Sequence, residues 1–337
     1  MLVKKKLCLL ILLVSAINVF YAQTNDTTYA EKLGYPKAAK VLIIHVDDAG
    51  MSYDSNEGAI NSIIKGAANS CSVMMPCPWV PAFVHYLKQH PGIDAGLHLT
   101  LTSEWSEYRW GSVTGKTVTP GLTDTEGNLW PSVEEVVKHA TADEVDKEIR
   151  AQLEKARTMG FEPTHLDSHM GTLFASPEFL KRYVTLGIEN HIPVMMPGGH
   201  DALIKEQMNA SEELLTGLRM LGKNLWAAGL PVLDDLHNYS YDWKIPDSII
   251  NQDQKIQAFK TKKYIDALTA LKPGVTMMIM HCTNPSAIFK EISDSGPTRK
   301  GDMLAMMDPA FKNALNDQGI VLTTWRELKE RRGKLKN

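Results

Sequence analysis

Short apolar runs alternate along this chain with segments of helical period, and this alternation limits the folds open to it. Residues 41–46 form a continuous apolar run, as expected for a strand covered on both faces. Comparable runs follow at residues 72–75, 93–101, 164–168, 192–196, 231–233, 275–281 and 320–323. The alternation predicts an α/β fold of βαβ units with a parallel sheet. About seven or eight parallel strands favour a TIM-barrel-like (β/α) barrel, with an open sheet as the alternative.

The segments between these runs contain residue patterns that predict where helices start and end. Thr141 and Glu144 form a capping box, and the helix that they open is expected to stop at Gly160. Pro177 stands at the first position of another predicted helix, which we expect Gly187 to close.

The N-terminus is typical of an exported protein. Residues 4–6 are lysines, an apolar run covers residues 7–19, and small residues follow. We therefore expect a signal peptide at 1–22, a polar lead-in at 23–38 and a single barrel domain at 39–337. A retained anchor is the alternative, although the run is short for a membrane span. The mature protein is expected in the periplasm or secreted, without a stable membrane span.

Composition excludes some classes of partner and of cross-link. The net charge of −3 gives no electrostatic basis for binding nucleic acid. Removal of the signal peptide leaves Cys71, Cys77 and Cys282, an odd number that makes a poor disulfide framework. We expect buried, free thiols, with a bond between Cys71 and Cys77 as the alternative.

Acidic and imidazole side chains stand at the ends of several predicted strands. Asp47 and Asp48 follow the first strand directly, and adjacent carboxylates there repel unless a cation or proton intervenes. His98 lies in another run, while alternation places Asp167 and His169 on one strand face. Taken singly, each could be an ordinary strand cap or a buried core histidine. Together they suit a divalent metal with nitrogen and oxygen ligands.

The same residues can fill every role in metal-assisted hydrolysis. Asp48, His98 and His169 can supply three ligands and leave one position open. Asp47 would be the general base, and His281, at the end of another predicted strand, the general acid. A buried histidine bonded to backbone is the alternative for His281.

Three motifs carry a family resemblance. The segments VDDAG (46–50), GLHLTLT (96–102) and PTHLDSH (163–169) resemble the signatures of YdjC-like deacetylases, which include chitooligosaccharide deacetylases. Their order and spacing hold from about residue 41 to 328, with late matches at His281 and Arg299. The resemblance implies a distorted (β/α) barrel with one divalent metal ion, zinc or magnesium. It also implies the ligand and base roles given above.

Two departures from the family pattern concern the substrate. Gly171 and Leu173 stand where the family continues with histidines, and residues 193–196 lack an arginine frequent there. The triad is unaffected, but these positions lie where a sugar would be recognised.

An unusually long connection, residues 103–131, offers aromatic side chains that could stack on a sugar. We name Trp105, Tyr108 and Trp110 as candidate substrate-binding residues, with a small core inside the loop as the alternative. Asp167 and Arg299 are further candidates for substrate contact.

The sequence thus predicts a metal-dependent carbohydrate deacetylase that releases acetate from N-acetylated sugars or oligosaccharides by amide hydrolysis. A catalytically idle glycan-binding protein with the same pocket is the alternative, although such a protein needs no acid–base pair. A phosphoesterase is disfavoured, because few Arg or Lys residues lie near the motifs. The expected partner is the carbohydrate substrate, with a homodimer left open.

Overall fold

The computed structural model describes residues 27–335, so the predicted signal peptide lies outside the described residues. The strands are β1 (Lys40–Ala49), β2 (Ser70–Val73), β3 (Ala95–Leu99), β4 (Leu166–Ser168), β5 (Asp235–His237), β6 (Gly274–Met280) and β7 (Val321–Leu322). The α-helices are α1 (Tyr29–Lys32), α2 (Tyr53–Ile64), α3 (Val80–Gln89), α4 (Val133–His139), α5 (Ala142–Thr158), α6 (Pro177–Asn190), α7 (Ala202–Met208), α8 (Glu212–Ala227), α9 (Asp253–Ala270), α10 (Gly296–Met306), α11 (Pro309–Asp317) and α12 (Trp325–Lys334).

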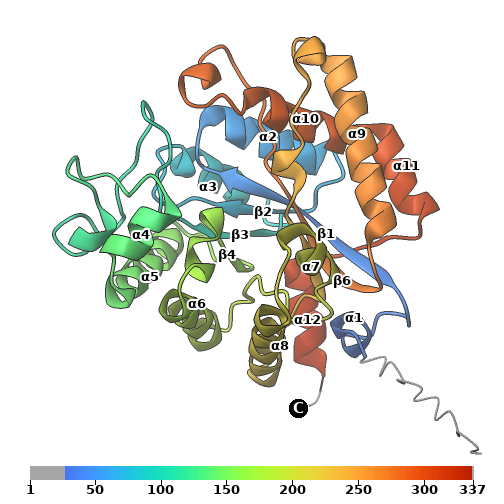
Figure 1. Ribbon diagram of the computed structural model, residues 1–337, viewed down its shortest axis with the longest axis horizontal. Coiled ribbons are helices and arrows are strands. Elements are labelled where there is room, and N and C mark those ends of the chain that lie inside the picture. The colour runs from blue at the N-terminus through green and yellow to red at the C-terminus, as the bar shows by residue number, and fades with distance from the viewer. Residues whose placement is uncertain (1–26, 336–337) are drawn as a thin grey trace, which may run out of the picture.

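The strands of the described chain form one parallel sheet in the order β4-β3-β2-β1-β6-β5, with β7 paired to β1. Between β4 and β5 the backbone hydrogen bonds continue through two extended segments. Leu166 of β4 bonds to residues 193 and 195, residue 198 bonds to Leu233, and Asp234 bonds to Val275 of β6. Helices surround these strands (Figure 1). The predicted parallel, distorted barrel is confirmed.

Two of the predicted strands are not regular strands. The run 192–196 makes a single parallel bridge, between Val194 and Leu166, and the run 231–233 makes one between Leu233 and Pro197. Prolines at 193, 197 and 231 explain this irregularity, because proline has no N–H to donate to a ladder. The strand β5 follows the second run two residues later.

The sequence predicted the starts of α5 and α6 correctly, but the predicted end of α6 was wrong. The capping box at α5 is formed by Thr141 and Glu144. Helix α6 does not stop at Gly187 but continues to Asn190. Gly187 instead permits close packing, since a Cβ there would lie 2.7 Å from a methyl group of Val194. Gly187 is therefore explained by close packing of α6 against the barrel wall and not by a helix end.

The segment expected to be a polar lead-in contains the short helix α1, which docks on the barrel. The N–H groups of Tyr29 and Ala30 donate to the carboxylate of Asp234, at 2.8 and 3.0 Å. Tyr35 bonds to Thr323 near the start of α12, so both ends of the described chain lie side by side (Figure 1). The lead-in is therefore part of the folded body.

The long connection between β3 and α4 has little regular structure: a 3₁₀ turn at Pro120–Leu122 and a bridge between Thr123 and Leu129. The three cysteines within residues 27–335 are buried and free, as predicted. In the same part of the chain, we find no helix with the length and apolarity that crossing a membrane requires.

Candidate active site

Asp47 and Asp48 reach the same site because β1 is irregular where they stand. Neighbouring residues of a regular strand point to opposite faces. Here the pairing register with β2 shifts between Val46 and Ala49, and Asp48 has a φ of 66°. Both carboxylates consequently approach His98, whose Nε2 lies 3.9 Å from Asp47 Oδ2 and 3.4 Å from Asp48 Oδ1. A left-handed conformation costs a non-glycine residue about 1 kcal/mol or more, which is typical of functional positions.

The two histidines of the predicted triad meet at Asp48. His98 lies on β3, and His169 opens the 3₁₀ segment His169–Phe174 immediately after β4. His169 Nδ1 is 3.4 Å from Asp48 Oδ1, and the two imidazole rings are 5.1 Å apart. All three side chains are buried.

The chemistry of these three groups fits a divalent cation. One ligand atom from each of Asp48, His98 and His169 lies within 4.8 Å of the others. Asp48 Oδ1 is buried and makes no hydrogen bond within the described residues. Its Oδ2 accepts a 2.6 Å hydrogen bond from Arg299. Although burial opposes ionisation, Arg299 holds the pKa of Asp48 well below its usual range. The carboxylate is thus charged, with one oxygen fixed and the other directed at two imidazoles, a donor set typical of zinc.

Each of these histidines is held from behind by a carboxylate. His98 Nδ1 lies 2.6 Å from Asp167 Oδ1, and His169 Nε2 lies 3.1 Å from Glu104 Oε2. Such partners orient a metal-binding imidazole and select its tautomer. The structure therefore places Asp167 behind His98, where it is 1% exposed. Its predicted contact with substrate stays a prediction.

His281 lies at the end of β6 and faces Asp47. Its Nε2 is 3.8 Å from Asp47 Oδ2. Burial lowers the pKa of His281, and the nearby Asp48 carboxylate opposes this only in part. Its backbone N–H donates to Asp302, which also accepts 2.8 Å hydrogen bonds from Lys260 and Tyr264. A buried polar network therefore holds the backbone of His281 in place.

The guanidinium of Arg299 forms one wall of the site. It is 3% exposed and lies 5.8 Å from the ring of Trp105 and 5.4 Å from that of Tyr241. Tyr241 is 41% exposed, and its ring also meets that of His281 at 4.9 Å. The contacts described for Arg299 are with Asp48, Ser295 and these two rings, so its predicted role in binding substrate stays untested.

For the aromatic residues of the loop, the sequence left two alternatives, contact with substrate or a small core inside the loop. The three side chains differ in burial. Trp110 is buried, and its Nε1 donates to Thr102 O. Trp105 and Tyr108 pack edge-on against Trp110 and are half-buried. The loop thus has a small core of its own centred on Trp110, and Trp105 joins that core to Arg299.

Three residues near the site were missed by the sequence analysis. His45 shares a strand face with Asp47, and its polar ring inside an otherwise apolar run was an available signal. Glu104 follows the third strand closely but stands in a loop of no recognisable pattern. Tyr241 lies in the short 3₁₀ turn Ser240–Asp242, where no sequence feature places it beside His281.

Comparison with known proteins identifies the family of this chain. Residues 41–317 match the YdjC-like protein family. A carbohydrate deacetylase of Thermus thermophilus is 28% identical over 300 residues, covering 89% of this chain and 97% of that protein. A chitooligosaccharide deacetylase of Yersinia enterocolitica is 31% identical over 135 residues, covering 39% of this chain and 49% of that protein.

The fold has a counterpart among solved structures. A proposed cellobiose-phosphate cleavage protein of Enterococcus faecalis superimposes with a TM-score of 0.67 at 18% identity, covering 86% of this chain and 99% of that one. This likeness shows the fold, and the family match extends over most of the chain, from β1 to the end of α11. This chain belongs to the YdjC-like protein family.

Proposed function

We propose that this protein is an exported, metal-dependent carbohydrate deacetylase that hydrolyses the acetamido group of an N-acetylated sugar. One observation carries the proposal: the triad of Asp48, His98 and His169 lies beside two groups suited to proton transfer, Asp47 and His281. The relatives that bear the name carbohydrate deacetylase support the substrate class. Export rests on the N-terminal sequence alone.

In this proposal Asp48, His98 and His169 hold the cation, zinc or magnesium. Bound there, a divalent cation supplies Lewis-acid polarisation of the amide carbonyl and lowers the pKa of a water molecule. Arg299 keeps Asp48 ionised for this task, while Asp167 and Glu104 fix the two rings.

The proton transfers fall to Asp47 and His281. Asp47 Oδ2 takes a proton from the attacking water, whose oxygen forms the new bond to the acetyl carbon. The proton held by Asp47 passes to Nε2 of His281, whose imidazole is neutral at rest because burial lowers its pKa. As the C–N bond breaks, His281 donates this proton to the departing amine. The products are acetate and the free amino sugar. The 3.8 Å between Asp47 Oδ2 and His281 Nε2 lets both act on one bound amide.

The first test is acetate release by the purified mature protein from a panel of N-acetylated mono- and oligosaccharides. We expect release that a chelator abolishes and added zinc or magnesium restores. The Asp47→Asn variant should retain its metal and lose at least about 100-fold in turnover, because the base is gone.

Two results would count against this reading. Release that persists after complete metal removal would contradict the role of the cation. Binding of the same sugars without acetate release, in metal-loaded protein, would instead support the glycan-binding alternative.

A further inference from the structure

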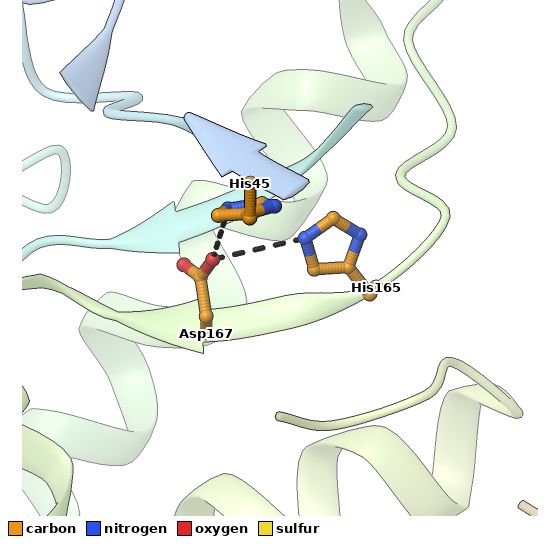
Figure 2. A group of neighbouring side chains, drawn as sticks. All are labelled: His45, His165 and Asp167. Atoms are coloured by element: carbon orange, nitrogen blue, oxygen red, sulfur yellow. Dashed lines mark ion pairs between the residues drawn. The ribbon is translucent and has the colours of Figure 1, made fainter. Parts of the chain in front are cut away.

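His45 occupies a buried position between two carboxylates that serve the site. It stands on β1, two residues before Asp47, and is completely buried. Its Nε2 lies 3.1 Å from Asp47 Oδ1 and 3.0 Å from Asp167 Oδ2. Figure 2 shows the second of these contacts, with the rings of His45 and His165 both facing the same oxygen of the Asp167 carboxylate.

The surroundings of His45 fix its ring. Ser70 Oγ lies 3.0 Å from Nδ1, and Ser72 Oγ lies 3.0 Å from Nε2. Ionised carboxylates only accept hydrogen bonds, so a nitrogen placed between two of them must carry the proton. Burial alone would lower the pKa of His45, but the neighbouring carboxylates of Asp167 and Asp47 raise it to about 9.

Each carboxylate uses one oxygen for His45 and the other for the site. Asp47 Oδ2 faces His281 and His98, at 3.8 and 3.9 Å. Asp167 Oδ1 takes the Nδ1 side of His98 at 2.6 Å. One imidazole therefore connects the proposed base to the support of a proposed metal ligand. Rotation of either carboxylate would move its oxygen away from Nε2 of His45.

His165 belongs to the same cluster but lacks this connection. Its ring meets that of His45 edge-on at 5.0 Å and stacks on Trp325 at 5.3 Å. Its Nε2 is 3.7 Å from Asp167 Oδ2, too long for a good hydrogen bond, and no contact with Asp47 is described.

The ligand atoms of His45, His165 and Asp167 lie close enough together to hold a metal ion. The distances around His45 favour hydrogen bonding instead, because its Nε2 has two carboxylate oxygens and a hydroxyl within 3.1 Å. A second cation would have to displace all of these contacts.

We propose that His45 is a positioning residue, which orients Asp47 for proton transfer and, through Asp167, orients His98 for metal binding. The part that concerns turnover rests on the proposed deacetylase function. The part that concerns the metal rests only on the cation site within that proposal, so it can be tested without turnover.

The test compares two His45 variants with one at His165. His45→Phe keeps a planar ring against His165 and removes both nitrogens. His45→Gln can return an N–H to the space between the carboxylates. His165→Phe is the matched control, since it removes a buried imidazole from the same cluster without touching Asp47.

We expect His45→Phe to lower kcat about 10- to 100-fold with KM changed less than about threefold, because the sugar contacts are unaltered. Zinc affinity of the metal-free protein, measured by chelator competition, should fall about 10-fold. His45→Gln should recover part of both losses. His165→Phe should leave kcat and zinc affinity within about threefold of wild type, whatever its effect on stability.

Three results would overturn the proposal. The first is unchanged kcat and zinc affinity in His45→Phe, and the second is an equal loss of kcat and zinc affinity in His165→Phe. The third is a second bound metal ion that is lost in both His45→Phe and His165→Phe. If His45→Phe does not fold, a wild-type zinc affinity in folded His45→Leu would have the same force. If the wild-type protein releases no acetate, the proposed function fails, while the zinc comparison still decides the role of His45 toward His98.

Discussion

Glu104 and Asp167 give the two histidines of the triad a similar support from different sources. Asp167 comes from the barrel strand β4, whereas Glu104 comes from the long connection after β3. Burial acts against the charge of Glu104, but His169 keeps its pKa below the usual range. The loop is thus tied to the site through an ionised carboxylate.

The Glu104→Gln variant tests whether this tie matters for the cation. A neutral amide holds the His169 ring more weakly, so we expect zinc affinity to fall by up to about 10-fold. Chelator competition on the metal-free protein measures it. Glu107→Gln, an exposed glutamate on the same loop, is the control and should leave affinity unchanged. Equal affinities in Glu104→Gln and wild type would mean that the loop does not support the ligand.

At the residue scale, the sequence identified which groups meet but not how they meet. The triad and Asp47 could be named because acidic and imidazole residues at several strand ends suit one cation. The left-handed conformation of Asp48 could not be foreseen, since it depends on a shift of pairing with β2. Glu104 was also out of reach, because a 29-residue connection without a repeating pattern gives no rule for its path.

At the element scale, Gly96 explains how β3 accommodates the buried histidine cluster. A Cβ at residue 96 would lie 2.5 Å from ring atoms of His165. That ring cannot easily move, because it stacks on Trp325, which is itself fully buried. The first residue of the GLHLT motif is therefore small for a packing reason, two positions before the proposed ligand His98.

Gly96→Ala should lower the free energy of unfolding by about 1–3 kcal/mol, as expected for overpacking a rigid core. Urea unfolding followed by tryptophan fluorescence would measure it. Gly92→Ala, in the turn just before β3, places its Cβ in open space and should change stability by less than about 0.5 kcal/mol. A Gly96→Ala variant as stable as wild type would show that the His165 ring moves aside.

Elements with uninterrupted apolar runs were the ones predicted well from sequence. β1 and β6 are long, buried and free of proline, and both were found close to their true bounds. The wall between β4 and β5 was found only in outline, because its prolines remove ladder hydrogen bonds while leaving the segments extended. The end of α6 was wrongly predicted at Gly187, because glycine occurs at close packing contacts as well as at helix ends.

At the scale of the whole molecule, the segment ahead of β1 docks on the barrel through the short helix α1. Asp234 accepts hydrogen bonds from α1 and, at 2.8 Å, from Val275 of β6. Asp201 and Asp235 lie nearby on the same side of the structure. This concentration of buried carboxylates was not evident from the sequence, because Asp201 stands 33 residues before the adjacent pair Asp234 and Asp235.

The carboxylate cluster predicts how global stability depends on pH. Burial and the neighbouring Asp235 raise the pKa of Asp201 to about 7, with Arg219 opposing in part. A group whose pKa is higher in the folded than in the unfolded state stabilises the fold when protonated. Its contribution is therefore complete below about pH 4, the ordinary carboxyl range, and is lost as the pH rises through about 7.

Asp201→Asn removes this loss, because the amide stays neutral and asparagine tolerates the left-handed conformation, with φ of 52° at this position. We expect the variant to exceed wild type in unfolding free energy by about 1–3 kcal/mol at pH 8 and by much less near pH 4.5. Urea unfolding at both pH values measures the difference. Asp266→Asn, on the exposed face of α9, should show no such pH-dependent gain. A gain for Asp201→Asn of equal size at both pH values would mean that the charge of Asp201 is not its source.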